Sequence, residues 1–275
     1  RLLEERRTEK SRESNHGGRN GREPGAAPAR WRPNMLLEIR DLSVAVADRE
    51  VLHAVNLDID QGETHVLFGK NGSGKTSLLM AMMGFSNYRI TGGRIRFKDQ
   101  DITRMPINER ARLGIGMAFQ RPPTLRGVKT RDLIRTFDKN NENRDKEIAG
   151  LNMGTFMDRD VNMGFSGGEI KKSELLQLIL QDPELILLDE PESGVDLENI
   201  KIIGRSIKKL LQKHLRRQRT KSGLIITHTG LILNYLEADM GHLLLDGHIR
   251  CEGNPREMFE TIQTAGYEEC ARCQR

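Results

Sequence analysis

The sequence predicts an α/β fold with a mixed, mainly parallel core sheet, an antiparallel β subdomain and a helical subdomain. Two segments, Leu185–Asp189 and Gly223–Thr227, are short and almost wholly apolar. Strands of this kind are buried on both faces, which is typical of a parallel sheet covered by helices. Other segments alternate apolar and polar residues around tight-turn signals such as Asp246-Gly247, which indicates antiparallel hairpins. The chain therefore combines both kinds of sheet.

Charge is distributed unevenly along the 275 residues. Residues 1–34 hold nine of the 44 Lys and Arg and five of the 39 Asp and Glu, which leaves 35 basic against 34 acidic residues in the rest. The net charge of +5 is therefore a property of the N-terminal segment and does not indicate a nucleic-acid-binding surface. We expect no nucleic-acid partner.

The N-terminal 34 residues are rich in Arg, Glu, Gly, Ser and Pro and lack apolar periodicity. We interpret residues 1–34 as a disordered or non-native N-terminal extension, with a functional basic arm as the alternative, and Met35 as the native start. Residues 35–266 are then expected to form the folded domain, followed by a C-terminal tail over residues 267–275.

Membrane and redox signals point to the cytoplasm. No apolar run approaches the 18 to 20 residues that span a bilayer, so we expect no direct membrane insertion. The three cysteines, Cys251, Cys270 and Cys273, are too few for a disulfide framework and fit a reducing cytosol. The Cys270-Ala271-Arg272-Cys273 motif indicates either part of a metal site or an exposed dithiol in a loose tail.

The N-terminal half begins with antiparallel strands. Residues 42–59 are predicted to form two or three strands, and residues 64–68 are predicted to form a buried strand. Two further strands are predicted at residues 94–98 and 115–119. From Arg121 to Phe165 the pattern becomes mainly helical, with a helix over Thr130–Asp138 and a polar loop over Lys139–Arg144. Together with a helix over Ile170–Leu180, this segment predicts a helical subdomain at about residues 121–181.

The C-terminal half alternates helices and strands. Two helices are predicted, Leu197–Leu215 with a basic last turn and Pro255–Ala265 with proline at its start. A hairpin is predicted over residues 243–251.

The segment Gly69–Thr76, GKNGSGKT, matches the phosphate-binding loop G-x-x-x-x-G-K-[ST] between a predicted strand and a predicted helix. Backbone N–H groups and the helix N-terminus converge on one point there, which suits a nucleotide phosphate. Lys75 would contact the β- and γ-phosphates, and the Thr76 hydroxyl would bind Mg²⁺. The candidate nucleotide-binding residues are Gly69, Lys70, Asn71, Gly72, Ser73, Gly74, Lys75, Thr76 and Ser77.

Polar residues follow three other apolar strands: Gln120, the pair Asp189-Glu190, and His228. Ligands of open α/β sheets bind at the carboxyl ends of the strands, so we expect these residues to share one site with the phosphate-binding loop. Gln120 and His228 alone fit ordinary capping or packing roles. Two adjacent carboxylates at a buried strand end require a cation or hydrogen-bond donors.

This combination resembles the ATP-binding-cassette (ABC) ATPase family from Leu36 to about Gly266, and predicts a P-loop ATPase cassette that hydrolyses ATP. The most diagnostic match is Ser166-Gly167-Gly168-Glu169, the family signature. The resemblance implies that the signature serves the ATP held by a second copy, in an ATP-dependent homodimer of cassettes. It also implies that Asp196 lies in the loop that crosses to that partner.

The resemblance assigns a role to each strand-end residue. Glu190 corresponds to the general base that polarises the attacking water, and His228 to the histidine that contacts the γ-phosphate. Gln120 corresponds to the glutamine that senses the nucleotide, and together with Thr76 and Asp189 it would hold Mg²⁺. One position departs from the family: Val46 stands where an aromatic residue usually stacks on adenine.

Several segments resemble the ATPase of the SUF iron–sulfur cluster assembly system, including Met117–Pro123, Val161–Glu169 and Glu192–Asp196. That resemblance implies soluble SufB/SufD-type scaffold proteins as partners, docked through Arg121–Phe165. Two alternatives stay open. One is the cytoplasmic ATP-binding subunit of an ABC membrane transporter, and the other is a cassette associated with nucleic acid, which the neutral core disfavours.

Overall fold

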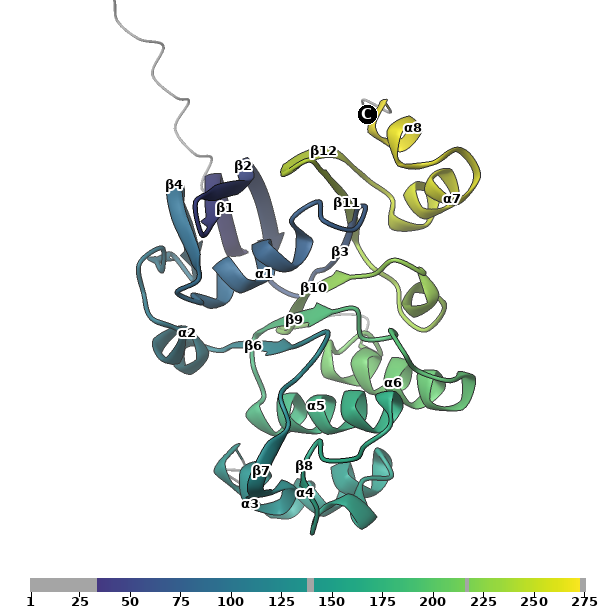
Figure 1. Ribbon diagram of the computed structural model, residues 1–275. Helices are drawn as coiled ribbons and strands as arrows, with labels where there is room; N and C mark the ends of the chain where they lie inside the picture. Colours follow the sequence, from purple (N-terminus) through teal and green to yellow (C-terminus); the bar gives the residue numbers. More distant parts are fainter. Residues whose placement is uncertain (1–33, 138–140, 216–217, 273–275) are drawn as a thin grey trace, which may run out of the picture. The chain divides into compact units, whose positions relative to one another are not determined.

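A six-stranded sheet lies at the centre of the computed structural model, which describes residues 34–137, 141–215 and 218–272 (Figure 1). Its strand order is β12-β11-β3-β10-β9-β6, and neighbouring strands are parallel except for β11 with β12. The strands are β3 (Thr64–Phe68), β6 (Ile115–Ala118), β9 (Leu185–Asp189), β10 (Ser222–Ile226), β11 (Met240–Leu245) and β12 (His248–Gly253). The predicted mainly parallel core sheet is confirmed.

Both faces of this sheet are buried because alternate residues of each strand point to opposite sides. In β9, Ile186 and Leu188 belong to one hydrophobic cluster and Leu187 to the other. The first cluster also contains residues of α5 (Gly167–Gln181), α6 (Leu197–Leu210) and α7 (Pro255–Ala265), and the second contains residues of α1 (Lys75–Met83). This two-sided cover explains why the core strands are almost wholly apolar.

An antiparallel sheet of order β2-β1-β4-β5 packs against the other side of α1 (Figure 1). Its strands are β1 (Met35–Val46), β2 (Arg49–Asp60), β4 (Tyr88–Phe97) and β5 (Gln100–Asp101), and α2 (Ile107–Leu113) follows. The segment predicted as two or three strands is a pair of long strands with register shifts. Asp41 and Ala54 have φ of +49° and +47°, so local bulges cause the apparent breaks in alternation.

The helical subdomain contains an element that the sequence did not predict. Its order is β7 (Leu125–Lys129), α3 (Thr130–Phe137), α4 (Asn141–Gly150), η1 (Gly154–Phe156), β8 (Asp160–Val161) and then α5. The strands β7 and β8 pair as an antiparallel ribbon. The prediction of loop over Lys139–Arg144 was wrong from Asn141 onward, because Ile148 packs on the core and holds α4 as a helix despite its polar composition.

Two predictions near the C-terminal end also need correction. Helix α6 ends at Leu210 rather than Leu215, and Gln212 has a left-handed φ of +52°. The expected loose tail contains helix α8 (Tyr267–Arg272), whose Cys270 is 1% exposed because it packs into the core. An exposed dithiol is therefore wrong for Cys270, and Cys273 lies outside the described residues, as does the expected extension before Asn34.

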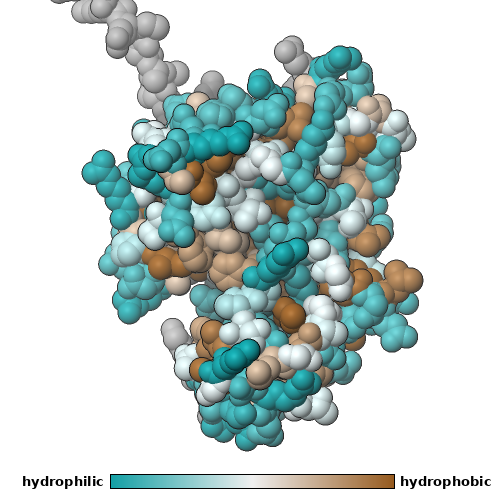
Figure 2. All heavy atoms as spheres, viewed as in Figure 1, coloured by the Kyte–Doolittle hydropathy of each residue, from teal (hydrophilic) through white to brown (hydrophobic). Residues whose placement is uncertain are grey.

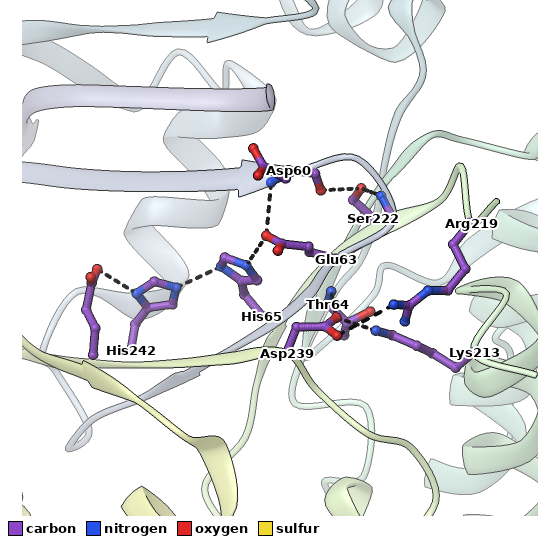
Figure 3. Close-up of polar contacts among 11 residues, drawn as sticks. Asp60, Glu63, Thr64, His65, Lys213, Arg219, Ser222, Asp239 and His242 are labelled. Carbon is purple, nitrogen blue, oxygen red and sulfur yellow. Dashed lines mark hydrogen bonds and ion pairs between the residues drawn. The ribbon is translucent and has the colours of Figure 1, made fainter. Parts of the chain in front are cut away.

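Two buried histidines and two more exposed carboxylates form a network at the opposite end of the sheet from the strand ends singled out above (Figure 3). His65 Nε2 lies 3.0 Å from Glu63 Oε2, His65 Nδ1 lies 2.8 Å from His242 Nε2, and His242 Nδ1 lies 2.9 Å from Glu252 Oε1. Each carboxylate can only accept, so the outer nitrogen of each imidazole must carry a proton, and the bond between the two rings needs one more. All three bonds therefore form when the two imidazoles together carry three protons. A fourth proton would set two N–H groups against each other.

We predict that this pair makes stability fall at acidic pH. Burial and the neighbouring His242 lower the pKa of His65 to about 4, although Glu63 and Asp239 oppose the shift. Because an unfolded histidine has a pKa near 6.5, the unfolded chain takes up the proton first as the pH falls. The free energy of unfolding should drop by up to about 3 kcal/mol between about pH 6.5 and pH 4, and be unaffected by His65 above that window.

Urea unfolding of the wild type and of His65→Gln at a series of pH values measures this contribution. The variant should show a shallower decline across the same window, whereas His214→Gln, at an exposed histidine, should not. An identical decline in wild type and His65→Gln would contradict the prediction.

Candidate functional site

The glycine-rich loop between β3 and α1 is wrapped around its own lysine. Gly72 and Gly74 have φ of +79° and +104°, conformations that favour glycine. The buried Lys75 Nζ donates to the carbonyl oxygens of Gly69 and Lys70, both at 2.8 Å. Burial lowers the pKa of Lys75 to about 8, against the opposing effect of nearby Glu190 and Asp189. The loop thus holds a desolvated cation beside two carboxylates.

Other predicted loop residues lie at different depths. Ser73 is 5% exposed, and its Oγ is buried without a hydrogen-bond partner. A Cβ atom built on Gly69 would meet that Oγ at 2.7 Å, so the hydroxyl lies inside the loop. Lys70 and Asn71 are exposed, and Ser77 is half-buried. A buried, unpaired hydroxyl in a phosphate-binding loop is available to a ligand.

Thr76 and Asp189 lie in direct contact. The Thr76 Oγ1 donates to Asp189 Oδ2 at 2.9 Å. Asp189 is 1% exposed, its Oδ1 is buried without a partner, and burial raises its pKa. A hydroxyl and an unsatisfied carboxylate oxygen form a hard-oxygen pair that fits Mg²⁺. Gln120, the third predicted ligand, contacts Glu190 instead of either residue.

Three strand ends converge on the carboxylate of Glu190. Gln120 Nε2, after β6, donates to Glu190 Oε2 at 2.6 Å, and His228 Nε2, after β10, lies 2.6 Å from Glu190 Oε1. Glu190 itself has a left-handed φ of +48°, and its N–H donates to Ile226 O at 3.1 Å. A non-glycine residue held in this conformation is typical of functional sites. The geometry therefore aims one carboxylate at the point where the strands end.

The signature motif forms the start of α5. Ser166 caps the helix by accepting from the Glu169 N–H, and the Glu169 carboxylate accepts from the Ser166 N–H at 2.7 Å, which is a capping box. A Cβ atom on Gly167 would lie 2.3 Å from Gly194 O, and one on Gly168 would meet Asn199. The two glycines let the N-terminal ends of α5 and α6 approach each other.

Asp196 caps α6 in the same way. Its carboxylate accepts from the N–H groups of Glu198 and Asn199, and these bonds, led by those from Asn199, lower its pKa. Within the described part of the chain, the hydrogen bonds of Ser166 and Asp196 join them to residues of their own helices and none reaches Gly69–Thr76. Among the described residues, these two predicted residues are therefore not hydrogen-bonded to the phosphate-binding loop.

Sequence reasoning missed three buried charged residues beside the site. Lys171 and Glu174, on α5, contact the backbone at Phe119–Gln120. Glu192 accepts from the hydroxyls of Thr227 and Thr229 on either side of His228. The available signal was the polar run Lys171–Glu174, which interrupts the apolar face that a buried helix needs.

Comparisons with known proteins extend these observations. Residues 52–193 match the protein family described as ABC transporter. The chain is 36% identical over 249 residues to "Probable ATP-dependent transporter SufC" of Escherichia coli (strain K12), covering 84% of this chain and 97% of that protein. It is 37% identical over 251 residues to "Probable ATP-dependent transporter ycf16" of Antithamnion sp., covering 85% and 97%.

A solved structure shares the fold. The crystal structure of a nucleotide-free ATP-binding cassette from an ABC transporter matches with a TM-score of 0.70, 24% identity, and coverage of 86% of this chain and 98% of that chain. None of the helices in the described part of the chain is both long and apolar enough to cross a bilayer. The face drawn in Figure 2 is mostly hydrophilic, with hydrophobic side chains in separate small groups.

Proposed function

Because the chain belongs to the family of ATP-binding-cassette ATPases, we propose that it uses ATP hydrolysis to change the conformation of a SufB/SufD-type scaffold for iron–sulfur cluster assembly. The observation that carries this proposal is the 36% identity to the E. coli protein named SufC, which extends over 97% of that protein. The second candidate is the ATP-binding subunit of a membrane transporter, which the word "transporter" in the names of both relatives favours. In both cases the chain would act in the cytoplasm.

We assign the nucleotide to the loop Gly69–Ser77. Lys75 and the backbone N–H groups would bind the β- and γ-phosphates, and Ser73 Oγ is free to donate to a phosphate oxygen. Thr76 and Asp189 would hold Mg²⁺, with Gln120 joining them if its side chain leaves Glu190. The metal would neutralise charge on the phosphates.

The residues around Glu190 fit water activation. Its carboxylate would accept the proton of the attacking water as the general base. Before nucleotide binds, His228 and Gln120 contact its two oxygens at 2.6 Å and would hold it in position. When nucleotide binds, His228 would turn to the γ-phosphate and Gln120 to the metal site. Ser166 and the N-terminal end of α5 would complete the site of a second copy, because they are exposed at a helix end suited to anions.

The docking surface that we propose is the helical subdomain after Gln120. All five residues of β7 are exposed, including the apolar Leu125 at 36% and Val128 at 40%, and Met163 after β8 is 41% exposed. Exposed apolar residues beside positive charge, here Arg121 and Arg126, are typical of an interaction surface. This surface begins directly at the predicted nucleotide sensor, so ATP binding and partner movement could be linked mechanically.

Co-purification from the native host tests the proposal. We expect the chain in the soluble fraction, bound to a soluble β-rich scaffold protein that mass spectrometry identifies. Arg121→Glu or Arg126→Glu should weaken that complex at least about tenfold and leave ATP binding intact. Arg205→Glu, at an exposed position on α6, is the matched control. Recovery in the membrane fraction with a polytopic partner would instead support the transporter subunit.

Nucleotide selectivity is predicted to be weak. Val46 is half-buried at the end of β1 and offers no aromatic face for an adenine ring. ATP and GTP affinities should therefore differ by less than about tenfold, or 1.4 kcal/mol, in titration calorimetry. Val46→Tyr should strengthen binding of both nucleotides by about 2- to 10-fold through stacking. A much larger preference for ATP in the wild type would mean that another residue reads the base.

A further inference from the structure

Helix α5 carries two buried charges in the turns that follow the signature motif. Lys171 is 4% exposed and Glu174 is 7% exposed. They are three residues apart, so their side chains lie on the same face of the helix, the face toward β6 (Figure 1). The same helix begins at Ser166, which caps its N-terminus.

Both side chains hold the backbone where the chain leaves the core sheet. Lys171 Nζ donates to Phe119 O at 2.7 Å and to Gln120 O at 3.0 Å. Glu174 Oε1 accepts from the Phe119 N–H at 3.2 Å. Strand β6 ends at Ala118, so the next two residues have no sheet partner for their backbone polar groups. The side chains of Lys171 and Glu174 provide hydrogen-bond partners for these groups instead. The backbone that carries the Gln120 side chain is thereby fixed to α5.

Two buried charged side chains lower the stability of the fold, so they are not needed for packing alone. Burial lowers the pKa of Lys171 and raises the pKa of Glu174 to about 7, because the charged form of each side chain is disfavoured away from water. Glu174 Oε2 is buried without a hydrogen-bond partner. Apolar residues of similar volume are often as stable as buried charged groups or more stable, so these two residues are better explained by the backbone geometry that they fix.

We propose that Lys171 and Glu174 form a clamp that makes Gln120 and Ser166 move together as parts of one rigid unit. The proposal rests on the roles assigned above, in which Gln120 responds to the ATP of its own chain and Ser166 contacts the ATP of the second copy. The clamp then connects the two ATP sites of a dimer through a single helix. Lys171 and Glu174 are positioning residues, since their contacts are with backbone groups and not with the phosphate-binding loop.

A comparison of two double-mutant cycles tests this clamp. The turnover numbers of Ser166→Ala, Gln120→Ala and the double variant are measured in the intact chain and again in a Lys171→Met/Glu174→Leu background. Linked residues give non-additive effects. In the intact chain the double variant should be at least about fivefold more active than the product of the single losses predicts. In the background without the clamp the losses should multiply, and the Hill coefficient for ATP should fall toward 1.

Controls separate the clamp from general damage. Lys172→Met alters an equally buried lysine on the same turn and should leave both readouts unchanged. Glu174→Gln on its own retains an oxygen that accepts from the Phe119 N–H, so it should preserve the non-additivity. If the Lys171→Met/Glu174→Leu background does not fold, Lys171→Met alone, which removes both bonds of the lysine, replaces it. Equal non-additivity with and without the clamp would overturn the proposal. Normal turnover in Ser166→Ala and Gln120→Ala themselves would overturn the roles assigned to those residues and the clamp with them.

Discussion

Glu190→Gln should bind ATP as tightly as the wild type and lose about 10²- to 10⁴-fold in turnover, the usual contribution of a general base. The amide cannot take a proton from water, but it keeps the size and the hydrogen-bonding oxygen of the side chain. Thr76 and Asp189 still contact each other, so the pair that we propose to hold Mg²⁺ is preserved. The variant should therefore accumulate an ATP-bound dimer, visible by size-exclusion chromatography with light scattering.

Asp189→Asn provides the contrast. This change removes the charge of the buried carboxylate beside Thr76, so it should weaken Mg²⁺-dependent ATP binding as well as turnover. Calorimetry with and without Mg²⁺ distinguishes the two variants. Turnover close to that of the wild type in Glu190→Gln would eliminate Glu190 as the base.

The sequence predicted the elements that hold the phosphate-binding loop because their signals are local. The apolar runs before Gly69 and Glu190 need no long-range information to be recognised as buried strands. The ribbon of β7 and β8 was not predicted because Leu125 pairs with Val161, which lies far away in the sequence. No local sequence pattern indicates a pairing between residues so far apart along the chain. Helices α4 and α8 also depend on tertiary packing, through Ile148 and Cys270.

For the site, residue types at strand ends could be predicted, but their contacts could not. That Gln120 and His228 both reach Glu190 depends on the strand order, which places β9 between β6 and β10. The buried Lys171 and Glu174 are hidden for a different reason. Charged residues on a helix are normally solvated, so the polar run Lys171–Glu174 marks an interruption of the apolar face, but the burial of these two side chains is visible only in the folded chain.

Two inactive variants should restore activity to each other when mixed. Lys75→Met removes the cation of the phosphate-binding loop, and Ser166→Arg places a bulky side chain at the signature, so each alone should lose at least about 10²-fold in turnover. If every site combines the loop of one copy with the signature of another, each heterodimer contains one complete site. A 1:1 mixture should then recover up to about a quarter of the wild-type activity, since half of the dimers are mixed.

The structure gives a reason to expect this exchange. Ser166 and Asp196 are exposed at the ends of two adjoining helices, and Leu197 beside them is 78% exposed, an unusual position for a large apolar side chain. A second copy bound at this face would cover Leu197. The N-terminus of α5 in the first copy would then contact the phosphates of the ATP held by the second copy. Because association has an entropic cost, the specific activity of the wild type should also rise with protein concentration. Mixing Lys75→Met with the Lys75→Met/Ser166→Arg double variant is the control, since neither chain supplies an intact loop. No recovery in the first mixture, or a wild-type rate independent of concentration, would mean that each chain completes its own site.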